Sequence, residues 1–116
     1  MVKHEPVVNR ARLLAGVRQA YGLPLVSLEF VPVGYASAVY LARTAGNIAY
    51  LLKMWPDVHT RREAVARLPL LRRLGDLDLG FSVPTPLSTV DGGLWSTFHG
   101  APFAVFPFID RSYAVG

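Results

Sequence analysis

Apolar residues recur at helical spacing near the N-terminus of the chain. Residues 7–21 place apolar side chains near one face, which is the pattern of an amphipathic α-helix. Gly22 and Pro24 follow, and both residue types end helices. The sequence therefore predicts a helix over 7–21. Its predicted apolar face comprises Val7, Leu13, Leu14, Val17 and Tyr21.

Alternating patterns follow in the next thirty residues. In 25–33, Val26, Leu28 and Phe30 alternate with polar residues, as in a half-buried strand. Segments 38–44 and 48–55 also have the composition of strands, and small or turn-forming residues separate the three segments. We therefore expect two antiparallel hairpins with short loops.

A second helix is predicted over 61–74. Thr60 is a good N-cap, and Glu63 three residues later completes a capping-box pattern. Pro69 lies inside this helix and is expected to bend or break it. Gly75 is a plausible C-terminal stop. The predicted apolar side comprises Val65, Leu68, Leu71 and Leu74.

The last third of the chain contains a proline-containing loop and short strands predicted at 87–90, 94–99 and 102–109. The order of elements predicts an α+β fold. It would have an antiparallel sheet of about five strands, one packed helix and an N-terminal helix.

Composition narrows the class of protein. The chain has 116 residues, of which 52% are hydrophobic and 17% are charged. We therefore expect residues 1–116 to form a single folded domain. The lack of cysteine favours a cytoplasmic protein, and neither a signal peptide nor a membrane span is predicted. The net charge is +4, and the arginines cluster in the second helix, where we interpret them as a solvated face rather than a nucleic-acid site.

Three features could carry chemistry. The turn Gly34–Ser37 has small residues whose backbone N–H groups could approach phosphate oxygens, although an ordinary hairpin turn is commoner. Lys53 lies in the apolar stretch IAYLLKMW, so its ammonium must either reach water at a strand end or meet an anion. Glu63 could pair with Lys53 or serve only the capping box, and the sequence leaves both open.

Together these features resemble the N-terminal lobe of the protein-kinase-like fold, in particular the aminoglycoside phosphotransferase family and its spectinomycin phosphotransferase branch. The resemblance covers nearly the whole chain, and VGYASAVY followed by LLK is its most specific part. It extends to the D-G turn that leads into FAVFPFID. The turn at 34–37 lacks the Gly-x-Gly-x-x-Gly pattern of protein kinases. Arg111 stands where a glycine commonly follows the FID stretch in this family.

The resemblance implies roles for particular residues. Gly34, Ala36 and Ser37 would belong to the loop over the nucleotide phosphates, and Lys53 would contact the α- and β-phosphates, held by Glu63. The segment that links the two lobes would read the base edge through the Pro107 carbonyl and the Ile109 N–H. The remaining implied nucleotide contacts are Val39, Phe106 and Phe108, and the base would be enclosed by Val33, Val39, Leu51, Phe106 and either Ile48 or Ala49.

The resemblance also implies what lies outside these residues. Phosphoryl transfer needs a carboxylate at the acceptor hydroxyl and ligands for Mg²⁺. In this family they come from a C-terminal lobe beyond the linker. We therefore expect a nucleotide-binding lobe for ATP or GTP with Mg²⁺ that ends just after the hinge. It would contain no catalytic residue, be inactive alone, and belong to a kinase for a small-molecule hydroxyl such as an aminoglycoside or spectinomycin.

Two alternatives remain at this point. The chain could be the equivalent lobe of a metabolic kinase such as homoserine kinase, which shares this layout. It could also be a non-catalytic module that docks another protein through an exposed apolar sheet face, since so short and apolar a chain has trouble covering its hydrophobic surface. The expected partners are therefore a nucleotide and either a C-terminal lobe or a dimer partner over the apolar face.

Overall fold

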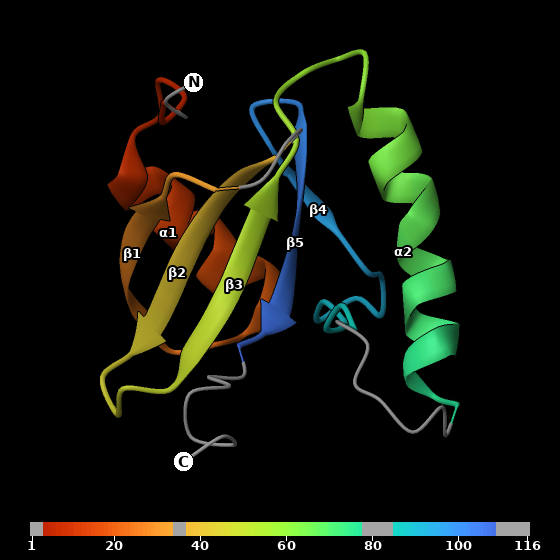
Figure 1. Cartoon of the computed structure of the whole chain (residues 1–116). Helices are drawn as coiled ribbons and strands as arrows, with labels where there is room; N and C mark the ends of the chain where they lie inside the picture. The colour runs from red at the N-terminus through yellow and green to blue at the C-terminus, as the bar shows by residue number, and fades with distance from the viewer. Residues whose placement is uncertain (1–3, 34–36, 78–84, 109–116) are drawn as a thin grey trace.

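The computed structural model describes residues 4–33, 37–77 and 85–108. Within them, five antiparallel strands form one sheet in the order β1-β2-β3-β5-β4, with two helices packed against it (Figure 1). This arrangement confirms the predicted α+β class. The elements are α1 (Arg10–Tyr21), β1 (Leu25–Val31), β2 (Ala38–Thr44), β3 (Ala49–Met54), α2 (Arg61–Gly75), β4 (Ser96–Phe98) and β5 (Ala101–Pro107).

Helix α1 begins three residues later than the sequence pattern indicated. The side chain of Asn9 caps it by accepting a hydrogen bond from the Arg12 N–H at 3.1 Å. Val7 therefore precedes the helix, is fully exposed and does not belong to the apolar face. The predicted end is confirmed, because Gly22 adopts φ +65° and donates its N–H to the Arg18 carbonyl.

A bulge in β1 changes which side chains face the core. The register with β2 shifts between Leu25 and Ser27, which places an extra residue on β1. Leu25 is buried, whereas Val26, expected to point inward, is 57% exposed. The predicted alternation holds only beyond the bulge, where Leu28 and Phe30 pack against the core.

Each face of the sheet packs against one helix. The larger core joins α1 to the inner side chains of β2, β3 and β5, including Tyr40, Leu52 and Phe103. The opposite face carries a smaller cluster of buried residues in which α2 contributes Leu68. Figure 1 shows α1 behind the sheet and α2 beside β4 and β5. The other buried members of the smaller cluster are Trp55, Ala104 and Phe106.

Two of the predictions concern the start and the interior of helix α2. Thr60 makes no capping hydrogen bond through its side chain, so the capping-box prediction is wrong. The Asp57 carbonyl accepts hydrogen bonds from the Thr60 and Arg61 N–H groups instead. Pro69 does not break the helix, which runs without interruption to Gly75. Leu68 is the buried residue of α2, which explains why the neighbouring Pro69 can face solvent.

The prediction of a strand at 87–90 is wrong. Leu87 donates one hydrogen bond to the Val105 carbonyl, but Val90 donates to the Ala20 carbonyl of α1, so the chain leaves the sheet here. The last two strands are close to expectation, and residue 109, predicted to end the final strand, lies outside the described residues. In the described part of the chain, neither helix has the length and apolarity needed to cross a membrane.

Candidate functional site

Lys53 lies on β3 in the middle of the sheet, on the face opposite α1. Its neighbours in the ladder are Val39 of β2 and Ala104 of β5. Leu52 and Met54, on either side of it in sequence, are buried in the α1 core, so the period of two turns Lys53 toward the other face. Its Nζ atom lies 5.2 Å from the centroid of the Phe106 ring.

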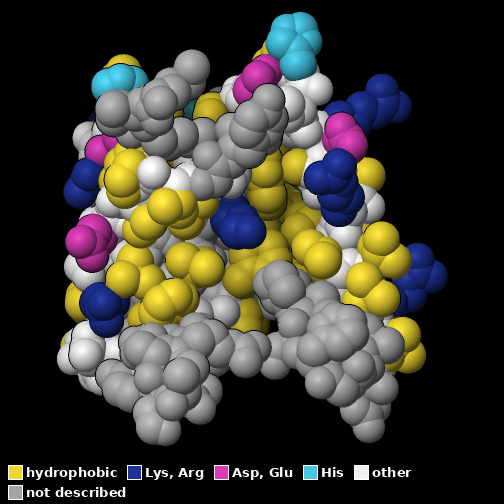
Figure 2. All heavy atoms as spheres, in the orientation of Figure 1, with side chains coloured by type: hydrophobic (Ala, Val, Ile, Leu, Met, Phe, Trp, Pro, Cys, Tyr) yellow, Lys and Arg dark blue, Asp and Glu magenta, His cyan; other side chains and the backbone are white. Residues whose placement is uncertain are grey.

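A cavity of about 460 Å³ opens over this face of the sheet. Figure 2 views this face and shows hydrophobic side chains gathered over the strands, with a basic side chain among them. The volume falls in the range of pockets that bind small molecules. The residues that line the cavity are Val31, Val33, Ser37, Val39, Leu41, Leu51, Lys53 and Phe108.

Several residues singled out in the sequence meet at this cavity. Ser37, Val39, Lys53 and Phe108 line it, as do Val33 and Leu51 from the set expected to enclose a base. Gly34, Ala36 and Ile109 lie outside the described residues.

Others lie around the cavity rather than in its lining. Phe106 is buried on the same face, and Pro107 is paired with Tyr50 at the end of β5. Ile48 is 59% exposed and, like Ala49, is absent from the lining. The Phe108 N–H donates to the Ala49 carbonyl at 3.4 Å, which keeps the end of β5 beside β3.

Neither a protein-family model nor a curated protein matches the sequence. Solved structures do match. The chain superposes on spectinomycin phosphotransferase APH(9)-Ia in complex with ADP and spectinomycin, with a TM-score of 0.68 and 17% identity over 90% of this chain and 30% of the other. For the AMP-bound complex of the same enzyme, the TM-score is 0.64 at 17% identity, over 88% of this chain and 29% of the other.

Amicoumacin kinase hAmiN, in complex with AMP-PNP, Ca²⁺ and Ami, also matches. Its TM-score is 0.57 at 15% identity, over 88% of this chain and 31% of the kinase. The part covered is the N-terminal region of these proteins. The fold is that of a kinase-like N-terminal lobe. The chain spans about a third of the length of these structural neighbours.

Glu63 does not approach Lys53 in this kinase-like lobe. Its side chain is 70% exposed and forms an ion pair with Arg67, one turn further along α2. Among the described residues, no carboxylate pairs with Lys53. Glu63 therefore makes neither of the two contacts that its position in the sequence suggested.

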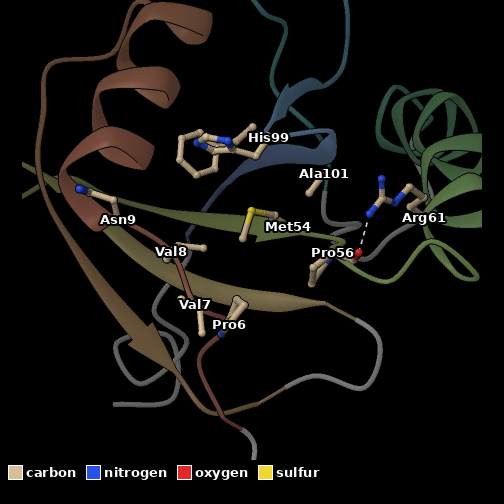
Figure 3. A pocket seen from close by; sticks show the side chains of 10 residues that line it. Pro6, Val7, Val8, Asn9, Met54, Pro56, Arg61, His99 and Ala101 are labelled. Carbon is tan, nitrogen blue, oxygen red and sulfur yellow. Dashed lines mark hydrogen bonds between the residues drawn. The ribbon is translucent and has the colours of Figure 1, made fainter.

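Arg61 fixes the start of α2 against the sheet. Its guanidinium donates hydrogen bonds to the Pro56 carbonyl at 2.5 Å and the Gly100 carbonyl at 2.7 Å. These bonds tie the helix to the end of β3 and to the turn between β4 and β5. Figure 3 shows the bond to Pro56 at the edge of a second cavity, of about 320 Å³, whose other walls include Met54 and the segment before α1. The kinase-like lobe therefore has its second helix attached at one end by polar bonds.

Two lining residues were not singled out from the sequence. Val31 ends β1, and Leu41 lies two positions beyond Val39 on β2. Period-two alternation along 39–43 could have identified Leu41, since it faces the same side as Val39. The contact between Lys53 and Phe106 depends on the register of β3 with β5, for which the sequence carried no signal.

Proposed function

We propose that this chain is the nucleotide-binding lobe of a phosphotransferase that acts on the hydroxyl group of a small molecule, such as an aminoglycoside or spectinomycin. The observation that carries the proposal is Lys53, a cation at an apolar cavity with no carboxylate partner among the described residues. An anionic ligand would satisfy this ammonium. The structural neighbours support a nucleotide as that ligand, since they were solved with ADP, AMP or AMP-PNP.

The cavity provides distinct surroundings for the two ends of a nucleotide. Its valine and leucine side chains suit the faces of a base, and the Pro107 carbonyl would accept a hydrogen bond from the base edge. Lys53 would meet the α- and β-phosphates. Ser37 and the turn that contains Gly34 and Ala36 would cover them, and backbone N–H groups in such a turn can bind anions.

The rest of the reaction is assigned to a separate C-terminal lobe. The transferred phosphoryl group would pass from ATP or GTP to the acceptor oxygen, whose proton a carboxylate accepts. The described residues contain no cluster of three or more His, Cys, Asp or Glu side chains suited to a metal ion. We propose that the ligands for Mg²⁺ and the acceptor site belong to that lobe, and that these 116 residues have no turnover by themselves.

The test is nucleotide binding to the Lys53→Met variant. Calorimetric titration with ATP and with GTP, each with Mg²⁺, measures both affinities. A lysine bond to phosphate contributes about 1.5–3 kcal/mol, so we expect affinity to fall roughly 10- to 150-fold. Arg73→Met is the matched control, because it removes one exposed positive charge from α2. An unchanged affinity in Lys53→Met would sink the assignment.

A second measurement tests the division of labour between lobes. The purified chain is incubated with nucleotide, Mg²⁺ and spectinomycin or an aminoglycoside, and mass spectrometry follows the antibiotic. No phosphorylated product is expected. Product formation would show that acceptor and metal groups lie within these residues.

One observation favours a second candidate function. Val33 and Phe108 line the cavity and are 53% and 40% exposed, so apolar surface continues outward from it. Such a surface also suits a non-catalytic module that docks another protein chain. Under this alternative the cavity would be part of an interface between proteins, and nucleotide would have no effect on the chain.

A further inference from the structure

We propose that the ring of Phe106 positions the Lys53 ammonium, which is the task that the kinase-like resemblance assigns to Glu63. The inference rests on the proposed function, because it concerns how Lys53 is held for phosphate. It requires no carboxylate near Lys53. It makes Phe106 a positioning residue that acts through Lys53.

The register of two strands brings the two side chains together. Lys53 pairs with Ala104, and Leu51 pairs with Phe106, so Phe106 is the diagonal neighbour of Lys53 on the same face. Diagonal neighbours in an antiparallel pair are within reach of long and aromatic side chains. The distance of 5.2 Å from Nζ to the ring centroid lies within the range of cation–π attraction.

Burial makes Phe106 a fixed support. Phe106 is 2% exposed and belongs to the same cluster as Leu68 of α2. Close packing within this cluster holds the ring in place. Helix α2 therefore acts on Lys53 through apolar packing rather than through Glu63, which is exposed and paired with Arg67.

An aromatic face holds an ammonium in a different way from a carboxylate. It attracts the cation through its quadrupole and brings no opposite formal charge. The net positive charge of Lys53 remains available to an anion, and so do N–H donors that a carboxylate would occupy. Beside an apolar cavity, this arrangement favours a ligand that brings its own negative charge.

The experiment separates phosphate binding from base binding. Calorimetry gives the affinities for adenosine and ADP, and for guanosine and GDP, without divalent metal. In the pair that binds more tightly, the affinity for the diphosphate is divided by the affinity for the nucleoside. This phosphate ratio measures what the phosphates add to binding. Phe106→Leu removes the ring face, and we expect this ratio, in which any change in nucleoside affinity cancels, to fall about 3- to 30-fold. Phe103→Leu is the matched control, since it removes an equally buried ring of β5 from the α1 core.

Two further variants keep the test decisive. The first replaces Phe106, and no other phenylalanine, by pentafluorophenylalanine, which keeps the shape of the ring but reverses its quadrupole. Because the shape is kept, this variant can be measured even if Phe106→Leu fails to fold. The same fall in the ratio is expected. In a Lys53→Met background, neither change at position 106 should lower the ratio again, because the two residues act as one unit.

The outcomes distinguish the inference from the function it rests on. If Lys53→Met leaves the phosphate ratio unchanged, the proposed function fails and the inference fails with it. If Lys53→Met lowers the ratio but neither ring variant does, Phe106 is not the positioning group and only the inference is overturned. A ratio that rises in the ring variants also overturns it, since the ring would then compete with phosphate.

Discussion

Glu5 is the centre of a polar network that ties the segment before α1 to the sheet. The guanidinium of Arg10 donates to both carboxylate oxygens of Glu5, at 2.6 and 2.7 Å, and the hydroxyl of Tyr40 on β2 donates at 3.0 Å. The hydrogen bonds from Arg10 are the main reason that the pKa of Glu5 is lowered. Burial, followed by the bond to Glu5, raises the pKa of Tyr40.

This network predicts an acid-dependent loss of stability. Because the folded-state pKa of Glu5 lies below its ordinary value of 4.5, its contribution is present above that value and disappears as pH falls through the lowered pKa. Glu5→Gln should therefore lower Tm by about 2–4 °C near neutral pH, and by progressively less as pH falls below 4.5. Thermal unfolding across pH measures this difference.

Asp91→Asn is the control for that prediction. Asp91 is exposed in the turn before β4 and forms no ion pair among the described residues, so the charge change is the same without the network. A loss in Glu5→Gln that does not vary with pH, or that Asp91→Asn reproduces, would contradict the assignment.

The sequence predicted some of the site at this scale and missed the rest. Lys53 stood out because an ammonium in an apolar strand requires a partner or water. Glu63 was ambiguous for a local reason, since the same position suits a cap, an ion pair across to the sheet, or an ion pair along the helix. The structure has the last of these, with Arg67. Local sequence cannot rank contacts whose energies differ by so little.

At the scale of the element, Pro69 makes α2 a helix with an internal weakness. Proline has no N–H to donate, so the Val65 carbonyl loses its usual helical partner. The helix nevertheless continues to Gly75, and a Cβ added to Gly75 would lie 2.0 Å from Oγ1 of Thr85. The far end of α2 therefore packs closely on Thr85, which helps the helix persist beyond the proline.

Replacing Pro69 should stabilise the protein. Proline inside a helix costs about 3 kcal/mol relative to alanine, and its restriction of the unfolded chain returns about 0.4–1 kcal/mol. We expect Pro69→Ala to raise the free energy of unfolding by about 2–3 kcal/mol, measured by urea denaturation. Leu70→Ala, at the next exposed position of α2, should change it by less than about 1 kcal/mol. A less stable Pro69→Ala variant would contradict the prediction.

Helices and strands were predictable where the spacing of apolar residues along the sequence matched the face that is buried in the structure. Helix α1 and strands β2 and β3 followed their patterns within a few residues. The error at Val26 arose because a bulge inserts one residue, which a strict period of two cannot anticipate. The strand expected at 87–90 had suitable composition, but Val90 bonds to α1 instead. Tertiary contacts overrode local preference at both places.

For the whole molecule, the order of the strands is what creates the site. β5 enters between β3 and β4, so it places Phe106 beside Leu51 and Lys53 although more than fifty residues separate them in the chain. No short-range pattern specifies such a pairing. The sequence and its resemblance to the kinase-like lobe predicted an antiparallel sheet of about five strands, but not the order of those strands.

The two candidate functions predict different behaviour in solution. A nucleotide-binding lobe should sediment as a monomer and become more resistant to heat when ATP or GTP is added, because a ligand of the folded state stabilises it. Sedimentation velocity and thermal unfolding with and without nucleotide measure both properties. A stable dimer whose melting temperature ignores nucleotide would favour the interaction module instead.

The position of Lys53 also makes the cavity chemically addressable. The sequence contains two lysines, Lys3 and Lys53, and only Lys53 lines the cavity among the residues that the structure describes. An acylating reagent that targets primary amines therefore has two side chains to modify, and peptide mapping can tell them apart. The yield of acylated Lys53 relative to acylated Lys3 becomes a direct reading of how far a ligand shields the cavity.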